Sequence, residues 1–232
     1  MILRARFTKL GRIRWTSHRD VARMWERALR RVRMPIAYTQ GFSPRPRLAF
    51  GLALPTGCES LAEYIDIAVS EPVDPPTLAG RLAGSFPEGV DVTAAAAVDA
   101  GAPSLQEAVS SCAWEMEVPG MTPGTLQEAV GRVLSADSLP LVRERKGRDV
   151  VDDLRPSVLA LSCRGSDGGG VRLVAELATR PRGVRPAELA RVMGVEFGCT
   201  RRTCQWIERD GSRWEPLPAD PEGSARARER AS

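Results

Sequence analysis

The chain has 232 residues, of which 43% are hydrophobic and 27% are charged. This is the composition of a globular protein long enough for two domains of ordinary size. No run of about eighteen apolar residues occurs, and Arg4 and Arg6 stand where a signal peptide would be apolar. The sequence therefore predicts a cytoplasmic protein that does not associate with membranes.

The formal net charge of +4 hides an uneven distribution along the chain. Residues 1–50 contain thirteen arginines and lysines against two carboxylates, whereas residues 51–140 contain two cations against thirteen carboxylates. A split of this kind is typical of a polyanion-binding face on a protein whose remainder repels nucleic acid. The polyanion that we expect is RNA.

The first domain is predicted over residues 1–100. Ser17 and Asp20 form the pattern of a capping box, and an apolar stripe at helical spacing follows until Pro35. The other predicted elements are strands at residues 2–8, 48–54, 63–69 and 90–98 and a second helix at 75–86. The resulting order, β-α-β-β-α-β, is the split βαβ arrangement of the ferredoxin-like fold.

The pattern partly repeats in a second domain, predicted over residues 104–214. It predicts strands at 112–118, 141–145, 157–163, 171–178 and 200–207, helices at 125–134 and 186–193, and a glycine-rich turn at 166–170. One strand is extra, but the order still indicates a second ferredoxin-like unit. We therefore expect an α+β protein of two tandem ferredoxin-like units with antiparallel sheets. Residues 215–232 have the composition of a disordered tail.

The first helix carries arginines on the side opposite its apolar stripe, namely Arg19, Arg23, Arg27, Arg30 and Arg31. Like charges at i,i+4 destabilise a helix, so this face favours anion binding over a merely solvated surface. The loop at 38–47 then interleaves aromatic and basic residues. Tyr38 or Phe42 could stack a base while Arg45 and Arg47 hold phosphates; alternatively, Phe42 packs a rigid turn. The predicted RNA- or anion-binding residues are Lys9, Arg14, His18, Arg19, Arg23, Arg27, Arg30, Tyr38, Phe42, Arg45 and Arg47.

His18 is the only histidine and therefore the one candidate for acid–base catalysis near neutral pH. A structural or phosphate-contacting role at the start of the helix is the alternative. The five cysteines are scattered and form no C-x-x-C pair, so no metal site is expected. Among the acidic residues Glu59, Glu63 and Asp66, the last two would face opposite sides of a strand, which favours surface charge over a metal site.

Several short segments form a recognisable set of motifs. They are Phe7-Thr8-Lys9, Arg14-Trp15-Thr16-Ser17-His18, Ala28-Leu29-Arg30-Arg31, Gly41-Phe42-Ser43-Pro44-Arg45-Pro46, Ala53-Leu54-Pro55-Thr56-Gly57, and Lys146-Gly147 with Asp153-Leu154-Arg155-Pro156. Together these segments resemble the bacterial radical-SAM-linked proteins. The resemblance implies a partner encoded nearby or fused, a radical SAM protein of the cobalamin-binding type. Trp15 replaces the usual Phe, and Arg19 stands where Leu is more common.

The chain itself has no C-x-x-x-C-x-x-C motif for an iron–sulfur cluster and no phosphate-binding loop. Radical chemistry would therefore belong to the partner, and we expect no cofactor in this chain. The sequence favours a non-catalytic accessory protein that binds RNA through its basic N-terminal domain. The alternatives are a metal-free endoribonuclease that uses His18 and a protein-docking module for an acidic partner.

Overall fold

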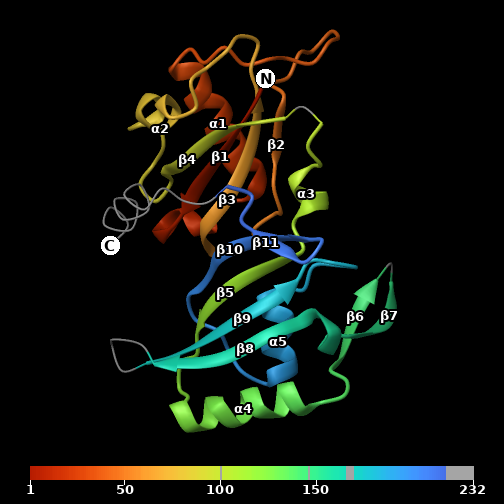
Figure 1. Cartoon of the computed structure of the whole chain (residues 1–232). Coiled ribbons are helices and arrows are strands. Elements are labelled where there is room, and N and C mark those ends of the chain that lie inside the picture. The colour runs from red at the N-terminus through yellow and green to blue at the C-terminus, as the bar shows by residue number, and fades with distance from the viewer. Residues whose placement is uncertain (100, 146, 166–169, 218–232) are drawn as a thin grey trace. The chain divides into compact units, whose positions relative to one another are not determined.

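The computed structural model describes residues 1–99, 101–145, 147–165 and 170–217 (Figure 1). It is a mixed structure of mostly antiparallel strands with few helices, so the α+β class predicted from the sequence is confirmed. The chain divides into two compact units. Unit 1 comprises Met1–Val109 together with the segment from Ile207 onward, and unit 2 comprises Ser110–Trp206.

Unit 1 contains a sheet with the strand order β4-β1-β3, in which β2 also pairs with β3. Its elements are β1(Ile2–Lys9), a 3-10 turn at Gly11–Trp15, α1(His18–Arg31), β2(Leu48–Phe50), β3(Glu59–Ala68), α2(Thr77–Leu82), β4(Val92–Val98), α3(Leu105–Ala108) and β11(Ser212–Trp214). All the pairs in this sheet are antiparallel. The predicted order of elements in this part of the chain is therefore observed, with α3 added after β4.

Helix α1 is anchored by the apolar stripe that the sequence indicated. Val21, Met24, Trp25, Ala28 and Leu29 are buried, in one core with Leu3, Ala5, Phe7, Ile65 and Ile67 from the sheet and Leu78 and Leu82 from α2. The side chain of Ser17 accepts a hydrogen bond from the backbone of Asp20 and donates one to the Asp20 carboxylate. The N-cap is thus confirmed, although the second bond of the predicted capping box joins the two side chains.

Several boundaries differ from those predicted. Strand β2 ends at Phe50 rather than at residue 54. Gly51 still donates to the Tyr64 carbonyl at 3.0 Å, and Gly51, Leu52 and Leu54 line a pocket. Strand β3 begins at Glu59 because Ser60 still pairs with Lys9. Helix α2 ends at Leu82, shortly before Gly84, whose φ of +71° is left-handed.

The expectation of disorder from residue 215 is wrong for the first residues of that segment. A guanidinium nitrogen of Arg6 forms an ion pair with Glu215, and the Tyr64 hydroxyl donates to the carbonyl of Leu217 at 3.3 Å. Arg6 is 5% exposed, and an arginine that is so deeply buried needs a carboxylate partner. This requirement was not visible in the composition of the segment. The rest of the predicted tail, residues 218–232, lies outside the described residues.

Unit 2 is built around a sheet with the order β10-β5-β9-β8, also antiparallel throughout. Its elements are β5(Ser111–Glu117), α4(Pro123–Ser135), β6(Pro140–Arg145), β7(Arg148–Asp153), β8(Val158–Gly165), β9(Val171–Ala178), α5(Pro186–Met193) and β10(Thr200–Arg209). The extra strand that the sequence predicted is half of a separate hairpin, β6-β7. Most of the predicted turn at 166–170 lies outside the described residues.

The Asp153-Leu154-Arg155-Pro156 segment has a structural role in unit 2. Asp153 Oδ1 accepts hydrogen bonds from the backbone N–H groups of Leu139, at 2.7 Å, and Arg155, at 2.9 Å. These bonds stabilise the carboxylate and hold the pKa of Asp153 below its usual value. The Arg155 guanidinium donates to the carbonyls of Leu134, Ala136 and Val158 at 3.1–3.2 Å. It therefore ties the end of α4 to the start of β8.

We predict that Arg155→Lys lowers the free energy of unfolding of unit 2. A lysine ammonium cannot reach three carbonyls in a fixed fork, and the lost bonds from a charged donor correspond to about 1–3 kcal/mol. Denaturant unfolding of the full chain measures the change. The matched control is Arg164→Lys at an exposed position of β8, and equal midpoints for the two variants would contradict this role of Arg155.

Candidate functional site

The thirteen cations of residues 1–50 fall into an internal and an exposed group. Arg4, Arg6 and Lys9 are buried. Arg4 makes a bidentate contact with Asp66 at 2.7 and 2.8 Å, and Lys9 Nζ donates to the carbonyls of Arg14 and Thr16 at 3.1 and 2.9 Å. Lys9, which the sequence assigned to anion binding, thus lies inside the domain and holds the turn before α1.

Arg14, another predicted anion-binding residue, lies at the border between these groups. A guanidinium nitrogen is 3.4 Å from Glu59 Oε1, and the group lies over the Trp15 ring, 5.4 Å from its centroid. Its side chain is about one-third exposed, at 32%. Arg14 is therefore accessible but already engaged with a carboxylate and a ring.

The exposed group covers the outward side of α1. Arg19, Arg23, Arg27, Arg30 and Arg31 are all exposed, as predicted from their position opposite the apolar stripe. Arg23 lies 3.4 Å from Asp20, but both side chains are more than half exposed, and such a pair contributes little. Within the described ranges, no other carboxylate pairs with these five arginines. The arginine face of α1, as we call this set, thus remains strongly cationic.

The loop at residues 38–47 is a hairpin that leads into β2 (Figure 1). Its arms are joined by backbone bonds from Thr39 N to the Arg45 carbonyl and from Arg47 N to the Ala37 carbonyl, both 2.9 Å. Phe42, near the tip, is fully exposed, and Tyr38 is about half exposed. Backbone bonds rather than Phe42 packing therefore hold the turn, and Phe42 is accessible. Arg45 and Arg47 are exposed as well.

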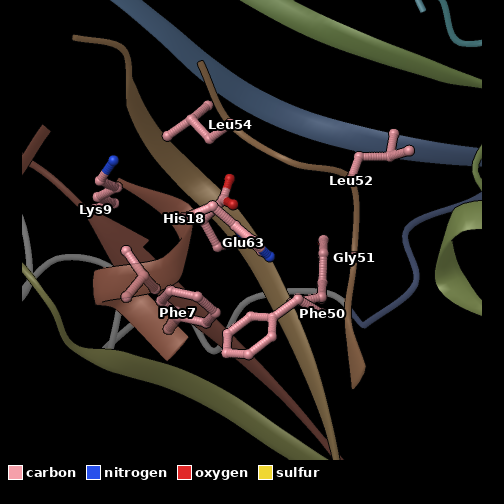
Figure 2. A pocket seen from close by; sticks show the side chains of 10 residues that line it. Phe7, Lys9, His18, Phe50, Gly51, Leu52, Leu54 and Glu63 are labelled. Atoms are coloured by element: carbon pink, nitrogen blue, oxygen red, sulfur yellow. The ribbon is translucent and has the colours of Figure 1, made fainter. Parts of the chain in front are cut away.

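A pocket lies beside the start of α1 (Figure 2). It is lined by Lys9 from β1, His18 from α1, Glu63 from β3, and Phe50 and Leu54 from β2 and the segment after it. Lys9 and Glu63 are buried, at 3% and 9% exposure, whereas His18 is exposed. The His18 ring contacts the Phe50 ring edge to face, with centroids 5.2 Å apart. One exposed imidazole thus stands beside two buried charged side chains.

Residues from separate segments of the resemblance meet at this pocket: Phe7 and Lys9, His18, and Leu54. The glycine of the Ala53–Gly57 segment has a packing role nearby. Gly57 has a φ of +89°, and a Cβ there would lie 2.9 Å from the Trp15 ring. Its N–H donates to the Arg14 carbonyl at 2.9 Å. Sequence reasoning missed Phe50, Leu54 and the buried placement of Glu63, since no local pattern brings these residues together.

The acidic residues are not the surface charges that the sequence predicted, since Glu59 and Glu63 are buried, at 4% and 9% exposure. Asp66 binds Arg4, while Glu63 lines the pocket with His18, so the two carboxylates face opposite sides of β3 as predicted. Glu59 accepts a hydrogen bond from the N–H of Gly11 at 2.8 Å. The described residues include no group of three or more His, Cys, Asp and Glu that could hold a metal ion. None of the five cysteines is in a disulfide.

No helix in the described portion of the chain is long and apolar enough to span a membrane. A search of curated proteins found no match. Residues 3–186 match the model of a family described as "Uncharacterized protein conserved in bacteria (DUF2344)". The matched range contains the arginine face, the 38–47 hairpin and the pocket. The chain therefore belongs to the bacterial DUF2344 family.

Proposed function

We propose that this protein is a non-catalytic accessory protein that binds single-stranded RNA through the arginine face of α1 and the 38–47 hairpin. The observation that carries the proposal is the exposure of five arginines whose only ion pair in the described ranges is the weak one between Arg23 and Asp20. Like charges on one helix face oppose helix formation. A polyanionic ligand would compensate for this cost.

The dimensions of the arginine face suit a nucleic acid backbone. Arg19 and Arg30 are separated by about 16 Å along the helix at about 1.5 Å per residue. That length spans a few phosphates of a single strand. Guanidinium groups bind phosphates through two parallel hydrogen bonds, which a lysine ammonium does not provide.

The hairpin would supply the base contacts. An exposed aromatic ring next to arginines is the usual arrangement for stacking a base while the backbone is held by charge. Phe42 is fully exposed near the tip, and Arg45 and Arg47 follow it in the same hairpin. Because Phe42 has no packing role in the hairpin, contact with a ligand is the role that we assign to it.

We also propose that both units are ferredoxin-like. In unit 1 the sheet order β4-β1-β3-β2 accompanies the chain order β-α-β-β-α-β. Unit 2 has the order β10-β5-β9-β8 and, once the β6-β7 hairpin is set aside, the same chain order. Such split βαβ units serve many functions, so the fold by itself does not indicate which ligand the protein binds.

The proposed partner is a radical SAM protein of the cobalamin-binding type, encoded nearby or fused. The support is the sequence resemblance, and three of its segments contribute residues to the pocket of unit 1. In this arrangement the chain presents an RNA to its partner in the cytoplasm, and the partner performs the chemistry. A docking surface for an acidic protein is the alternative use of the same arginines. Recovery of an acidic protein without RNA in a pull-down would favour it.

We predict that changing Arg23 and Arg27 to Gln weakens RNA binding and flattens its salt dependence. Removing two phosphate contacts should reduce the slope of log K against log salt by about 1.4, at about 0.7 per phosphate of a single strand. Fluorescence anisotropy with a labelled RNA over a series of salt concentrations measures the slope. Thermal melting should be nearly unchanged, because both side chains point to solvent.

The control for this pair removes two exposed arginines from unit 2, Arg132 and Arg164, which lowers the net charge equally. It should leave the slope close to that of the wild type. Equal slopes for both double variants and the wild type would contradict the proposal. Unfolding of the Arg23 and Arg27 variant would show that these arginines are structural.

Phe42→Ala should weaken RNA binding with little change in salt slope. Stacking of one base on an aromatic side chain contributes about 1–3 kcal/mol and releases no counterions. The same anisotropy series separates the two effects, since the intercept changes while the slope does not. The control is Phe42→Tyr, which retains a stacking ring and should bind RNA like the wild type. Undiminished RNA affinity of Phe42→Ala would show that the hairpin is not part of the proposed interface.

A metal-free endoribonuclease is the second candidate, because His18 lines a pocket with Lys9 and Glu63. General acid–base catalysis usually recruits a second titratable group near the first. We predict that neither the wild type nor His18→Ala cleaves RNA in EDTA, as judged by gel electrophoresis of a labelled substrate. Cleavage by the wild type and not by the variant would replace the accessory role with the nuclease.

A further inference from the structure

Trp15 is 65% exposed, although the turn that carries it is firmly held. It ends the 3-10 turn that joins β1 to α1. The carbonyls of its two neighbours, Arg14 and Thr16, both accept hydrogen bonds from Lys9 Nζ, at 3.1 and 2.9 Å. The Arg14 carbonyl also accepts from the Gly57 N–H at 2.9 Å. The backbone that presents Trp15 is therefore fixed, while most of its side chain is in contact with solvent.

The orientation of the Trp15 ring is fixed as well. A Cβ at Gly57 would lie 2.9 Å from a ring carbon, so the glycine lets one part of the ring pack against the backbone. The Arg14 guanidinium lies 5.4 Å from the ring centroid and pairs with Glu59 at 3.4 Å. The indole N–H makes no hydrogen bond within the described ranges. A rigid, exposed tryptophan ring offers a large contact area to a ligand at a small cost in conformational entropy.

The charges around Trp15 favour a nucleotide over an apolar protein surface. Arg12 and Arg19, which precede and follow it in the chain, are exposed and form no ion pair in the part of the chain that the structure describes. An apolar surface would remove their guanidinium groups from water without supplying a counter-charge, which is unfavourable. A nucleotide supplies a base for the ring and a phosphate for the arginines.

The 3-10 turn and the 38–47 hairpin lie near opposite ends of α1. The turn is joined to the start of β3 by the contact of Arg14 with Glu59. The hairpin is joined to the end of β3 by a bond of 2.8 Å from the Ala37 N–H to the Ala68 carbonyl. Because β3 has 10 residues, the two junctions are about 30 Å apart at about 3.3 Å per residue. Helix α1 connects the turn to the hairpin, so its arginine face lies between them.

We infer that Trp15 is a second base-stacking site and that one RNA strand runs along α1 from Trp15 to Phe42. Each of the two rings stacks a base, and the arginine face holds the phosphates of the nucleotides in between. Strands that are long enough to reach both rings bind more tightly than shorter ones. This inference rests on the RNA-binding function proposed above and adds to it a contact residue and a minimum strand length.

The test compares a short and a long strand of labelled oligoadenylate by fluorescence anisotropy. At about 3.4 Å per stacked nucleotide, about 4 nucleotides cover about 14 Å and about 16 nucleotides cover about 54 Å. Trp15→Leu keeps an apolar side chain but has no ring for stacking. Its affinity for the long strand should fall about tenfold, as expected for one stacked base. Its affinity for the short strand should fall much less, because the Phe42 ring remains available.

Two controls separate stacking from a structural role. Trp15→Phe retains a ring and should bind the long strand like the wild type. It should nevertheless lose the part of the RNA-induced quenching of tryptophan fluorescence that a base stacked on Trp15 causes. Trp214→Leu removes another exposed tryptophan of unit 1 and should leave both affinities unchanged. The Phe variant tests the contact even where Trp15→Leu lowers the melting temperature.

Equal long-strand affinity of the wild type and Trp15→Leu, or equal quenching of the wild type and Trp15→Phe, would overturn the inference. If the salt slope still depends on Arg23 and Arg27 in that case, the RNA-binding function stands without a second stacking site. If Trp15→Leu weakens binding of the long strand but the slope does not depend on these two arginines, Trp15 is a stacking site and the function proposed for the arginine face fails.

Discussion

The packing of α1 on the sheet of unit 1 determines where every other functional feature lies. Trp25 is fully buried. The centroid of its ring lies 5.1 Å from that of the Phe7 ring and 4.8 Å from that of the Phe86 ring. Burial of such a large side chain contributes several kcal/mol and fixes the rotation of the helix about its axis. With that rotation set, the arginines at the other positions must point to solvent, and His18 must lie beside β2.

Burial also divides the cations into two groups with different roles. Arg4 and Arg6 occupy alternate positions of β1 on the face away from α1, where Asp66 and Glu215 neutralise them. A buried arginine without such a partner would destabilise the domain. The excess of positive charge that residues 1–50 expose at the surface is therefore smaller than their sequence indicates. The exposed cations are concentrated on α1 and its neighbouring loops.

The segments that carry the family resemblance divide in a similar way. Gly57 packs against Trp15, and Asp153 and Arg155 bind backbone groups, so these residues maintain the structure. Phe42 and the α1 arginines have no comparable structural contacts among the described residues, and His18 contacts the Phe50 ring. Ligand binding would explain why these aromatic and basic side chains are exposed and have no packing role.

The sequence by itself determined most helices and strands of both units, because apolar periodicity and the Ser17 cap act over a few neighbouring residues. It did not indicate α3, β7 or β11. It also determined the outward direction of the α1 arginines and the opposite orientations of Glu63 and Asp66, which follow from helix and strand geometry alone. Only the tertiary structure decided which cations are internal. Arg6 and Glu215 are far apart in the chain, and so are Lys9, His18, Phe50 and Glu63, which meet at one pocket. Local patterns carry no information about these long-range contacts, because the contacts depend on strand pairing and on the packing of α1 against the sheet.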